Sequence, residues 1–296
     1  MRRRFVGCVP GLVLALVLVW PFLSAAAPRP AQERTAAEAA SGSFDPHDFS
    51  GFWVITKGHR AISANVPPMT PEGEARLAAN KPTRGRFLGE PLNGDHPGFV
   101  RAVRLPGDGN DPSHQCNPNG FPRLLLDHEP IEFARLEDRW LQLFQWERAL
   151  REFWMDGRDV PAGENLDNLG PAWYGHSVGE WQGDTLVVTT VGLDDRAWMD
   201  IFGFPKSASA RFEERYRRTG PDTIELQITL YDPTFYTAPW VSDTKVFSRM
   251  PREELTFFGW TGLYSGITEA ICAPINEVDN YNARIRDPGS FGASGK

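Results

Sequence analysis

The stretch Gly175-His176-Ser177-Val178-Gly179 contains the side chain of this sequence best suited to proton transfer. An imidazole gives or accepts a proton near neutral pH, which is what general acid–base catalysis requires. The flanking glycines would let a backbone or a substrate approach the ring closely. We therefore take His176 as the candidate acid or base. The alternative is a histidine that is hydrogen-bonded into a turn and fixes the hairpin that follows.

Two aspartates are candidates for the carboxylate that orients His176. Asp200 could hold the imidazole in one tautomer, as a carboxylate does for a catalytic histidine, or it could cap the segment that follows it. Asp156 precedes Gly157 and Arg158, and this arginine could clamp a carboxylate. A hairpin turn with a surface arginine is the plainer interpretation. The predicted catalytic set is His176, Asp200 and Asp156, with Arg158 binding the substrate.

Aromatic side chains are abundant, and they include ten tryptophans. Several lie beside the polar motifs, in loops where binding sites usually form. They could line a cavity, or they could fill a core or hold rigid proline-rich turns. The residues predicted to line the site are Trp154, Trp173, Tyr174, Trp198, Tyr236 and Trp240.

The sequence lacks the standard motifs of cofactor and metal sites. It contains no GxSxG nucleophile motif, no P-loop and no GxGxxG on a βαβ unit. His114 and His128 flank Cys116, and with Asp111 they could hold a metal, but their spacing fits no standard site. We therefore predict no cofactor and no metal ion.

The N-terminus has the three parts of a secretory signal peptide: three arginines, an apolar run over 5–23 and small residues at 24–27. We predict a signal peptide over 1–26, a disordered leader over 27–44 and a single β-rich domain over 45–290. The apolar run is nearly long enough to span a bilayer, so a retained anchor is the alternative. Cleavage would place the mature chain in the periplasm or outside the cell, with no stable membrane span.

An exported chain meets an oxidising compartment, where Cys116 and Cys272 would form a disulfide. Two buried thiols are the alternative. Loss of the signal arginines takes the formal net charge from −7 to about −10. Since this acidity comes without any basic stripe, we predict no nucleic-acid partner.

The elements that must position these residues are mostly short strands. Residues 223–231 alternate apolar and polar with a period of two, which is typical of a strand with one buried face. Glu214 and Arg215 fall on opposite faces of another strand, so one of them must point inward, most simply in an ion pair. The predicted strands cover 49–56, 130–136, 140–146, 150–155, 178–181, 185–191, 210–218, 223–231, 241–247 and 255–260.

Helical and irregular segments are few in this pattern. A threonine cap and a proline at the first helical position predict one helix within 69–79. Residues 81–122 are rich in Gly, Pro, Asn and Asp and predict a long irregular loop. Many short strands joined by tight turns favour a mainly β, antiparallel, barrel-like fold of the lipocalin kind, because a closed barrel leaves no exposed edges.

Two motifs resemble those of a large family of exported bacterial proteins, most of them uncharacterised. These motifs are Asn110-Asp111-Pro112 with Cys116-x-Pro-x-Gly-x-Pro-Arg123, and Gly175-His176-Ser177-Val178-Gly179-x-Trp181-x-Gly-Asp-Thr-Leu-Val-Val188. The resemblance covers roughly 49–285 and implies export, but no settled activity. Two positions depart from the family pattern. Lys206-Ser207 stands where a His-Ser pair is usual, and Ala273-Pro274 follows Cys272 where some members carry His-Glu.

These features favour an exported, cofactor-independent enzyme that acts on a small apolar or aromatic molecule by proton transfer. A lyase, hydratase or isomerase step would meet that description. The alternative is a lipocalin-like carrier, in which the aromatic side chains grip a hydrophobic ligand without chemistry. A structural or carbohydrate-binding protein with exposed tryptophan platforms is a third class.

Overall fold

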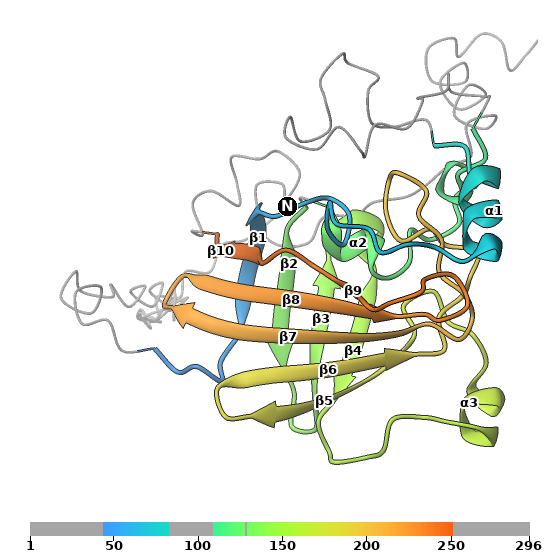
Figure 1. The fold of residues 1–296 in the computed structure, drawn as a ribbon. Coiled ribbons are helices and arrows are strands. Elements are labelled where there is room, and N and C mark those ends of the chain that lie inside the picture. The colour runs from blue at the N-terminus through green and yellow to red at the C-terminus, as the bar shows by residue number, and fades with distance from the viewer. Residues whose placement is uncertain (1–43, 83–108, 128, 251–296) are drawn as a thin grey trace, which may run out of the picture. The chain divides into compact units, whose positions relative to one another are not determined.

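The computed structural model describes residues 44–82, 109–127 and 129–250 (Figure 1). The predicted signal peptide, all but the last residue of the predicted leader, His128, the predicted strand at 255–260 and Cys272 lie outside these ranges. The disulfide between Cys116 and Cys272 therefore stays a prediction. None of the described helices is long and apolar enough to cross a membrane.

The described chain forms one sheet of ten strands, in the order β10-β1-β2-β3-β4-β5-β6-β7-β8-β9. Strand β10 pairs with both β1 and β8, so nine of these strands close into a barrel and β9 extends one edge of β8. The strands are β1 (Gly51–Lys57), β2 (Ile131–Arg135), β3 (Arg139–Phe144), β4 (Leu150–Trp154), β5 (His176–Gln182), β6 (Thr185–Val191), β7 (Arg211–Gly220), β8 (Thr223–Tyr231), β9 (Trp240–Val241) and β10 (Lys245–Arg249).

The predicted mainly β, barrel-like fold is confirmed, with one difference in strand direction. Strands β4 and β5 pair in parallel, whereas the other pairs are antiparallel. The cause is the long connection over 155–175, which returns along the barrel and carries α3 (Glu164–Leu169) before β5 begins (Figure 1). Adjacent antiparallel strands need only a tight turn, but parallel neighbours need a crossover of this length.

Alternation along the strands builds the barrel core. In β8 the side chains of Ile224, Leu226, Ile228 and Leu230 are all buried, as the period of two predicts. Large aromatic rings from β2, β3, β4 and β7 fill much of the interior together with Phe49, at centroid separations of about 6 Å between neighbours. The barrel is thus packed by side chains over much of its length.

A buried ion pair lies among these rings. Glu214 points inward and binds Arg151 through both oxygens, whereas Arg215 lies half-exposed on the outer face. Arg151 also donates to Ser177, Thr190 and Gln142, and Tyr216 donates to Glu214 at 2.6 Å. The expectation of an inward-facing ion pair at this strand is therefore confirmed. Every polar group of the pair has a partner, which buried charges require.

The helices are short. Helix α1 (Pro71–Ala79) confirms the predicted helix, and its cap Thr70 accepts the amide N–H of Gly73 at 3.1 Å. The other helical segments are η2 (Pro112–Gln115), α2 (Arg123–Leu126), η3 (Trp146–Arg148) and α3.

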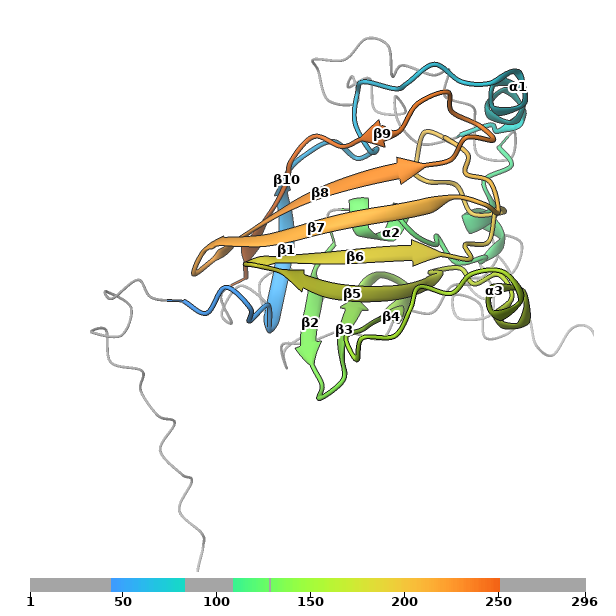
Figure 2. The same ribbon diagram turned by 60° about the horizontal axis from the view of Figure 1, so that its bottom comes forward.

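The two ends of the barrel differ. At one end, which we call the loop end, lie the connections 58–82, 109–127, 145–149, 170–175, 192–210 and 232–239. Helices α1 and α3 lie beyond this same end of β6 and β8 in both views (Figures 1 and 2). The opposite end carries tight turns such as 136–138, 183–184 and 220–222. Long connections with irregular backbone are the usual place for functional side chains, so the loop end is where a site is expected.

Candidate active site

The residues singled out in the sequence fall at both ends of the barrel. In the parallel pair β4–β5, Trp154 lies opposite Val178, so Asp156 is level with the far part of β5. His176 begins β5 at the loop end. At the usual rise per strand residue, Asp156 and His176 are separated by roughly 13 Å along the barrel. The prediction that Asp156 orients His176 is therefore not supported by the fold.

Arg158 is bound to its own turn. Its guanidinium donates to both carboxylate oxygens of Asp156, at 2.8 and 2.6 Å, and lies 3.8 Å above the ring of Trp154. These hydrogen bonds lower the pKa of Asp156. The geometry is that of a hairpin turn with a surface arginine, which is the plainer of the two sequence interpretations. Asp156 and Arg158 are thus exposed, and with the half-buried Trp154 they form a group remote from the loop end.

His176 is half-buried and has a backbone partner. Its Nε2 lies 2.9 Å from the carbonyl oxygen of Gly170, so that nitrogen carries the proton in this contact. The ring packs against Gly192, where a Cβ atom would approach it to 2.8 Å. Gly175 has φ +67°, and a Cβ there would lie 2.8 Å from the carbonyl oxygen of Val191. These glycines serve a close turn, and His176 fixes the entry into β5.

Asp200 does not contact His176. The Asp200 carboxylate is fully buried, and its Oδ1 accepts the amide N–H groups of Phe202 at 2.9 Å and Phe204 at 3.2 Å. The predicted His176–Asp200 pair is corrected accordingly: Asp200 caps the segment that follows it. This was the other role open to it in the sequence, where an aspartate before a tight turn often binds backbone amides.

The other carboxylate oxygen of Asp200, Oδ2, takes no part in this cap. Within the described part of the chain no hydrogen-bond donor reaches Oδ2, although it is buried. Burial raises the pKa of the Asp200 carboxyl from 3.8 to about 7, against the opposing effects of the backbone amides and of Arg123. Buried polar atoms are nearly always satisfied, so an unsatisfied carboxylate oxygen in such a setting is a mark of a functional group.

The aromatic residues predicted to line the site are mostly packing residues. Tyr236 donates its hydroxyl to the carbonyl oxygen of Pro205 at 2.9 Å, and Trp240 donates its indole N–H to Ser63 Oγ at 2.9 Å. Both rings are buried and lie 5.5 Å apart, and Trp198 is buried nearby in sequence to Asp200. Trp173 is half-buried beneath the guanidinium of Arg196. Tyr236, Trp240 and Trp198 are therefore packing residues, which is the alternative that the sequence left open for them.

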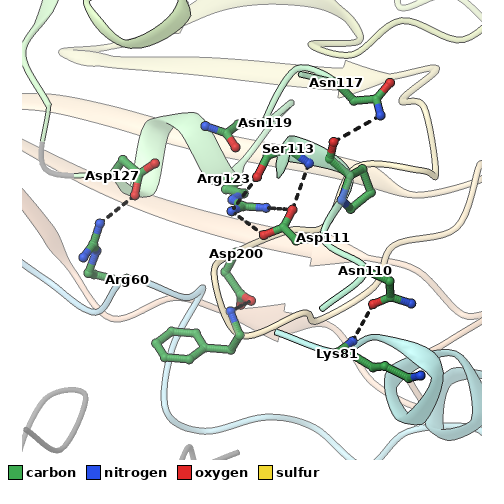
Figure 3. Close-up of polar contacts among 12 residues, drawn as sticks. Arg60, Lys81, Asn110, Asp111, Ser113, Asn117, Asn119, Arg123, Asp127 and Asp200 are labelled. Atoms are coloured by element: carbon green, nitrogen blue, oxygen red, sulfur yellow. Dashed lines mark hydrogen bonds and ion pairs between the residues drawn. The ribbon is translucent and has the colours of Figure 1, made fainter. Parts of the chain in front are cut away.

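Asp111 and Arg123, from the motif around Cys116, lie near Asp200 (Figure 3). Asp111 accepts the amide N–H of Ser113 at 3.0 Å and so caps η2. It also binds Arg123 through two hydrogen bonds of 2.9 and 2.8 Å, and both side chains are buried. Arg123 in turn lies within electrostatic range of Asp127 and Asp200. The spacing between Asp111 and Arg123 thus serves a buried ion pair that holds this loop.

Glu147 and Tyr174 form a second polar pair at the loop end. Glu147 has φ +62°, and Arg148 after it also has positive φ. Tyr174 donates its hydroxyl to Glu147 at 2.7 Å, and the backbone N–H of Asn119 donates to the same carboxylate at 2.9 Å. Burial raises the pKa of Glu147. Strained backbone of this kind concentrates at functional sites. In the sequence Tyr174 stood out only as an aromatic residue, and Glu147 did not stand out at all.

The described residues contain no group of three or more His, Cys, Asp or Glu side chains arranged to hold a metal ion. No family model matches the sequence, and it has no significant match among curated proteins. The site must therefore be interpreted from its own geometry.

Proposed function

We propose that this protein is an exported, cofactor-independent enzyme that transfers a proton to or from a small apolar or aromatic molecule at the loop end of the barrel. Asp200, rather than His176, is the proton-transferring group in this proposal. A lyase, hydratase or isomerase reaction fits a single carboxyl group that works near neutral pH. Export to the periplasm or beyond follows the N-terminal pattern and the resemblance of the two motifs to an exported family.

The observation that carries the proposal is the buried Oδ2 atom of Asp200, which has no hydrogen-bond donor among the residues that the structure describes. A general base needs a lone pair that no other donor occupies, together with a pKa near the working pH. The backbone amides of Phe202 and Phe204 hold Oδ1 and fix the orientation of the carboxyl group. The rings that follow it are apolar, which suits an apolar substrate.

The carrier alternative has less support from the described residues. A carrier of the lipocalin kind holds its ligand inside the barrel. Here the buried Arg151–Glu214 pair crosses the interior, and the ring of Phe121 lies 3.9 Å from the Arg151 guanidinium. These side chains occupy the space that a ligand would take in that part of the barrel. A ligand site at the loop end is compatible with the ion pair and with the position of Phe121.

The test is proton exchange with solvent. The purified chain is incubated in D₂O with a bacterial periplasmic metabolite extract, and small molecules that gain deuterium or change mass are identified by mass spectrometry. A general acid or base contributes about 10²–10⁴-fold to a rate, so Asp200→Asn should lower the exchange rate by at least about 100-fold. Asp156→Asn, at the opposite end of the barrel, is the matched control and should leave the rate unchanged.

The outcomes separate the two functions. Exchange that persists in a folded Asp200→Asn variant would refute the role of Asp200. A metabolite that is retained by the wild-type chain and by both variants, without exchange or change of mass, would identify a carrier. His176→Gln adds a third arm, because the structure assigns His176 to the entry into β5 and predicts reduced stability with the chemistry retained.

A further inference from the structure

Two lysines are buried at the loop end, and they differ in how their amines are bound. Lys245 Nζ donates three hydrogen bonds, to the carbonyl oxygens of His59 at 2.7 Å and Ala61 at 2.9 Å and to Asp243 at 2.6 Å. An ammonium group has three donors, so all of those of Lys245 are used. Lys245 is therefore a structural cation that ties β10 to the segment after β1.

Lys206 is equally buried but has far fewer partners. Its side chain has no exposed surface, and within the described residues its Nζ makes one hydrogen bond, to the carbonyl oxygen of Ala197 at 2.6 Å. One acceptor satisfies one N–H of an amine and leaves the rest of the nitrogen unused. A charged ammonium in this position would keep two donors without acceptors, which is costly in a buried site.

The charged groups around Lys206 have opposing effects on the amine. The pKa of Lys206 falls to about 7, because burial and the charge of Arg123 lower it more than Asp194, Asp195 and Asp232 raise it. Near neutral pH a large share of this amine is then unprotonated and keeps its lone pair. The nearby carboxylates would stabilise a positive charge that later forms on the nitrogen. Depressed lysine pKa and nearby acids are what amine nucleophiles require.

The segment just before Lys206 packs among aromatic rings. The neighbouring carbonyl of Pro205 accepts the hydroxyl of Tyr236, and the ring of Phe204 lies edge-on to Trp240 at 5.0 Å. The amine is enclosed, so a reactant must arrive by a local opening of the loop over 192–210. Small size and lack of charge favour such entry, because a charged molecule loses its hydration there.

We propose that Lys206 is a nucleophilic amine that forms a Schiff base with a small, uncharged aldehyde or ketone. The nitrogen lone pair attacks the carbonyl carbon, and a proton moves from nitrogen to oxygen to give a carbinolamine. The carbinolamine then takes up one proton from solvent and loses water, which leaves a protonated imine. One C=N bond replaces the C=O bond, and the positive charge lies on nitrogen among the carboxylates. This covalent site goes beyond the proton transfer assigned to Asp200 and does not depend on it.

The test traps the imine on the full-length protein. The folded chain is treated near neutral pH with acetaldehyde and sodium cyanoborohydride, whose hydride reduces the C=N bond to a stable ethylamine, and the modified lysines are located by peptide mapping. The sequence has only five lysines, so each site is resolved. A fall of one pKa unit gives about tenfold more free amine, so Lys206 should be modified at least about tenfold faster than the exposed Lys57.

Lys245 is the matched control because it is buried at the same end with its donors occupied. We expect it to stay unmodified in the folded chain. In urea all the lysines should react at similar rates, and the preference for Lys206 should disappear. The Asp200→Asn variant should still be modified at Lys206, whether or not it has lost proton exchange.

Two results would overturn the proposal. One is modification of Lys57 while Lys206 stays unmodified in the folded chain. The other is modification of Lys206 and Lys245 at equal rates, since that would reflect opening of the loop end alone. Neither measurement needs a variant of Lys206 that might fail to fold.

Discussion

The buried ion pair in the barrel gives the sharpest prediction for stability. In Arg151→Met, the Glu214 carboxylate would stay fully buried and lose both guanidinium contacts, with the hydroxyl of Tyr216 as its remaining donor. Leaving one member of such a pair unpaired typically costs about 3–5 kcal/mol, because an uncompensated charge stays in a region of low dielectric constant. For a chain of this size that loss lowers Tm by roughly 6–20 °C.

The double variant Arg151→Met/Glu214→Leu separates the charge from the packing. Replacing both members of a buried pair with apolar residues is often close to neutral, so we expect at least about half of the lost stability to return. The polar neighbours keep partners, since Ser177 and Thr190 bond to each other at 2.9 Å. The measurement is urea unfolding of the wild type, of Arg151→Met, of Glu214→Leu and of the double variant.

Arg158→Met is the matched control for this cycle. Arg158 also binds one carboxylate through two nitrogens and lies over a tryptophan, but in solvent at the opposite end of the barrel. Exposed pairs contribute little, so this variant should unfold almost as wild type does. If the losses in the two single Arg151 and Glu214 variants simply add in the double variant, the pair has no coupling and our account of the interior is wrong.

Three further predictions concern the loop end. Between pH 3.8 and about 7 the folded Asp200 keeps a proton that the unfolded chain has released. The free energy of unfolding should therefore fall by up to about 1.4 kcal/mol per pH unit as pH rises. Urea unfolding at about pH 5 and about pH 7 measures this slope, and Asp200→Asn should remove it. Arg123→Met leaves the Asp111 carboxylate buried without its partner and should cost about 3–5 kcal/mol in the same assay, whereas a loss below about 1 kcal/mol would show that solvent reaches Asp111. Thr70→Ala removes the cap of α1 and should cost about 1 kcal/mol in thermal melting, with an unchanged Tm as the contrary result.

Much of the barrel could be predicted from the sequence because its signals are local. Alternation in 223–231, the turn at 183–184 and the capped helix after Thr70 each depend on a few neighbouring residues, and each is present in the structure. The same period of two predicted that either Glu214 or Arg215 points inward, and the structure shows that it is Glu214. Helix α3 (Glu164–Leu169) was missed because six residues are too few to show helical periodicity.

The parallel β4–β5 pair could not be predicted in the same way. Consecutive strands with turn signals between them favour an antiparallel meander, and only the length of the 155–175 connection argues for a crossover. This one pairing places Asp156 and His176 at different levels of the barrel. The predicted pairing of Asp156 with His176 thus failed through topology, because the residue types alone gave no information on which end of the barrel each motif would occupy.

The other differences between the predicted and the observed site come from contacts that form only in the folded chain. His176 attracted attention because imidazole is a versatile group, but a backbone carbonyl 2.9 Å from its Nε2 gives it a structural role. Lys206 stood out only as a departure from the family pattern, and Glu147 carried no signal, since a glutamate in a short turn is common on surfaces. The burial of Lys206 and the strained backbone of Glu147 arise from tertiary packing, which a single sequence does not reveal.

The buried charges of this protein divide into two groups by how completely they are bound. Glu214 in the barrel has hydrogen-bond donors on both oxygens, and Lys245 has acceptors for all three of its donors. Asp200 and Lys206 are just as buried, yet one oxygen of the first and much of the amine of the second lack partners within the described chain. A fold retains a buried group that destabilises it only where something else needs that group. Arg123 Nε also lacks a partner within the described residues, but the rest of that guanidinium is held by Asp111. Because Asp200 and Lys206 both lie in the connection between β6 and β7, the reactive chemistry belongs to this loop and the barrel serves to hold it.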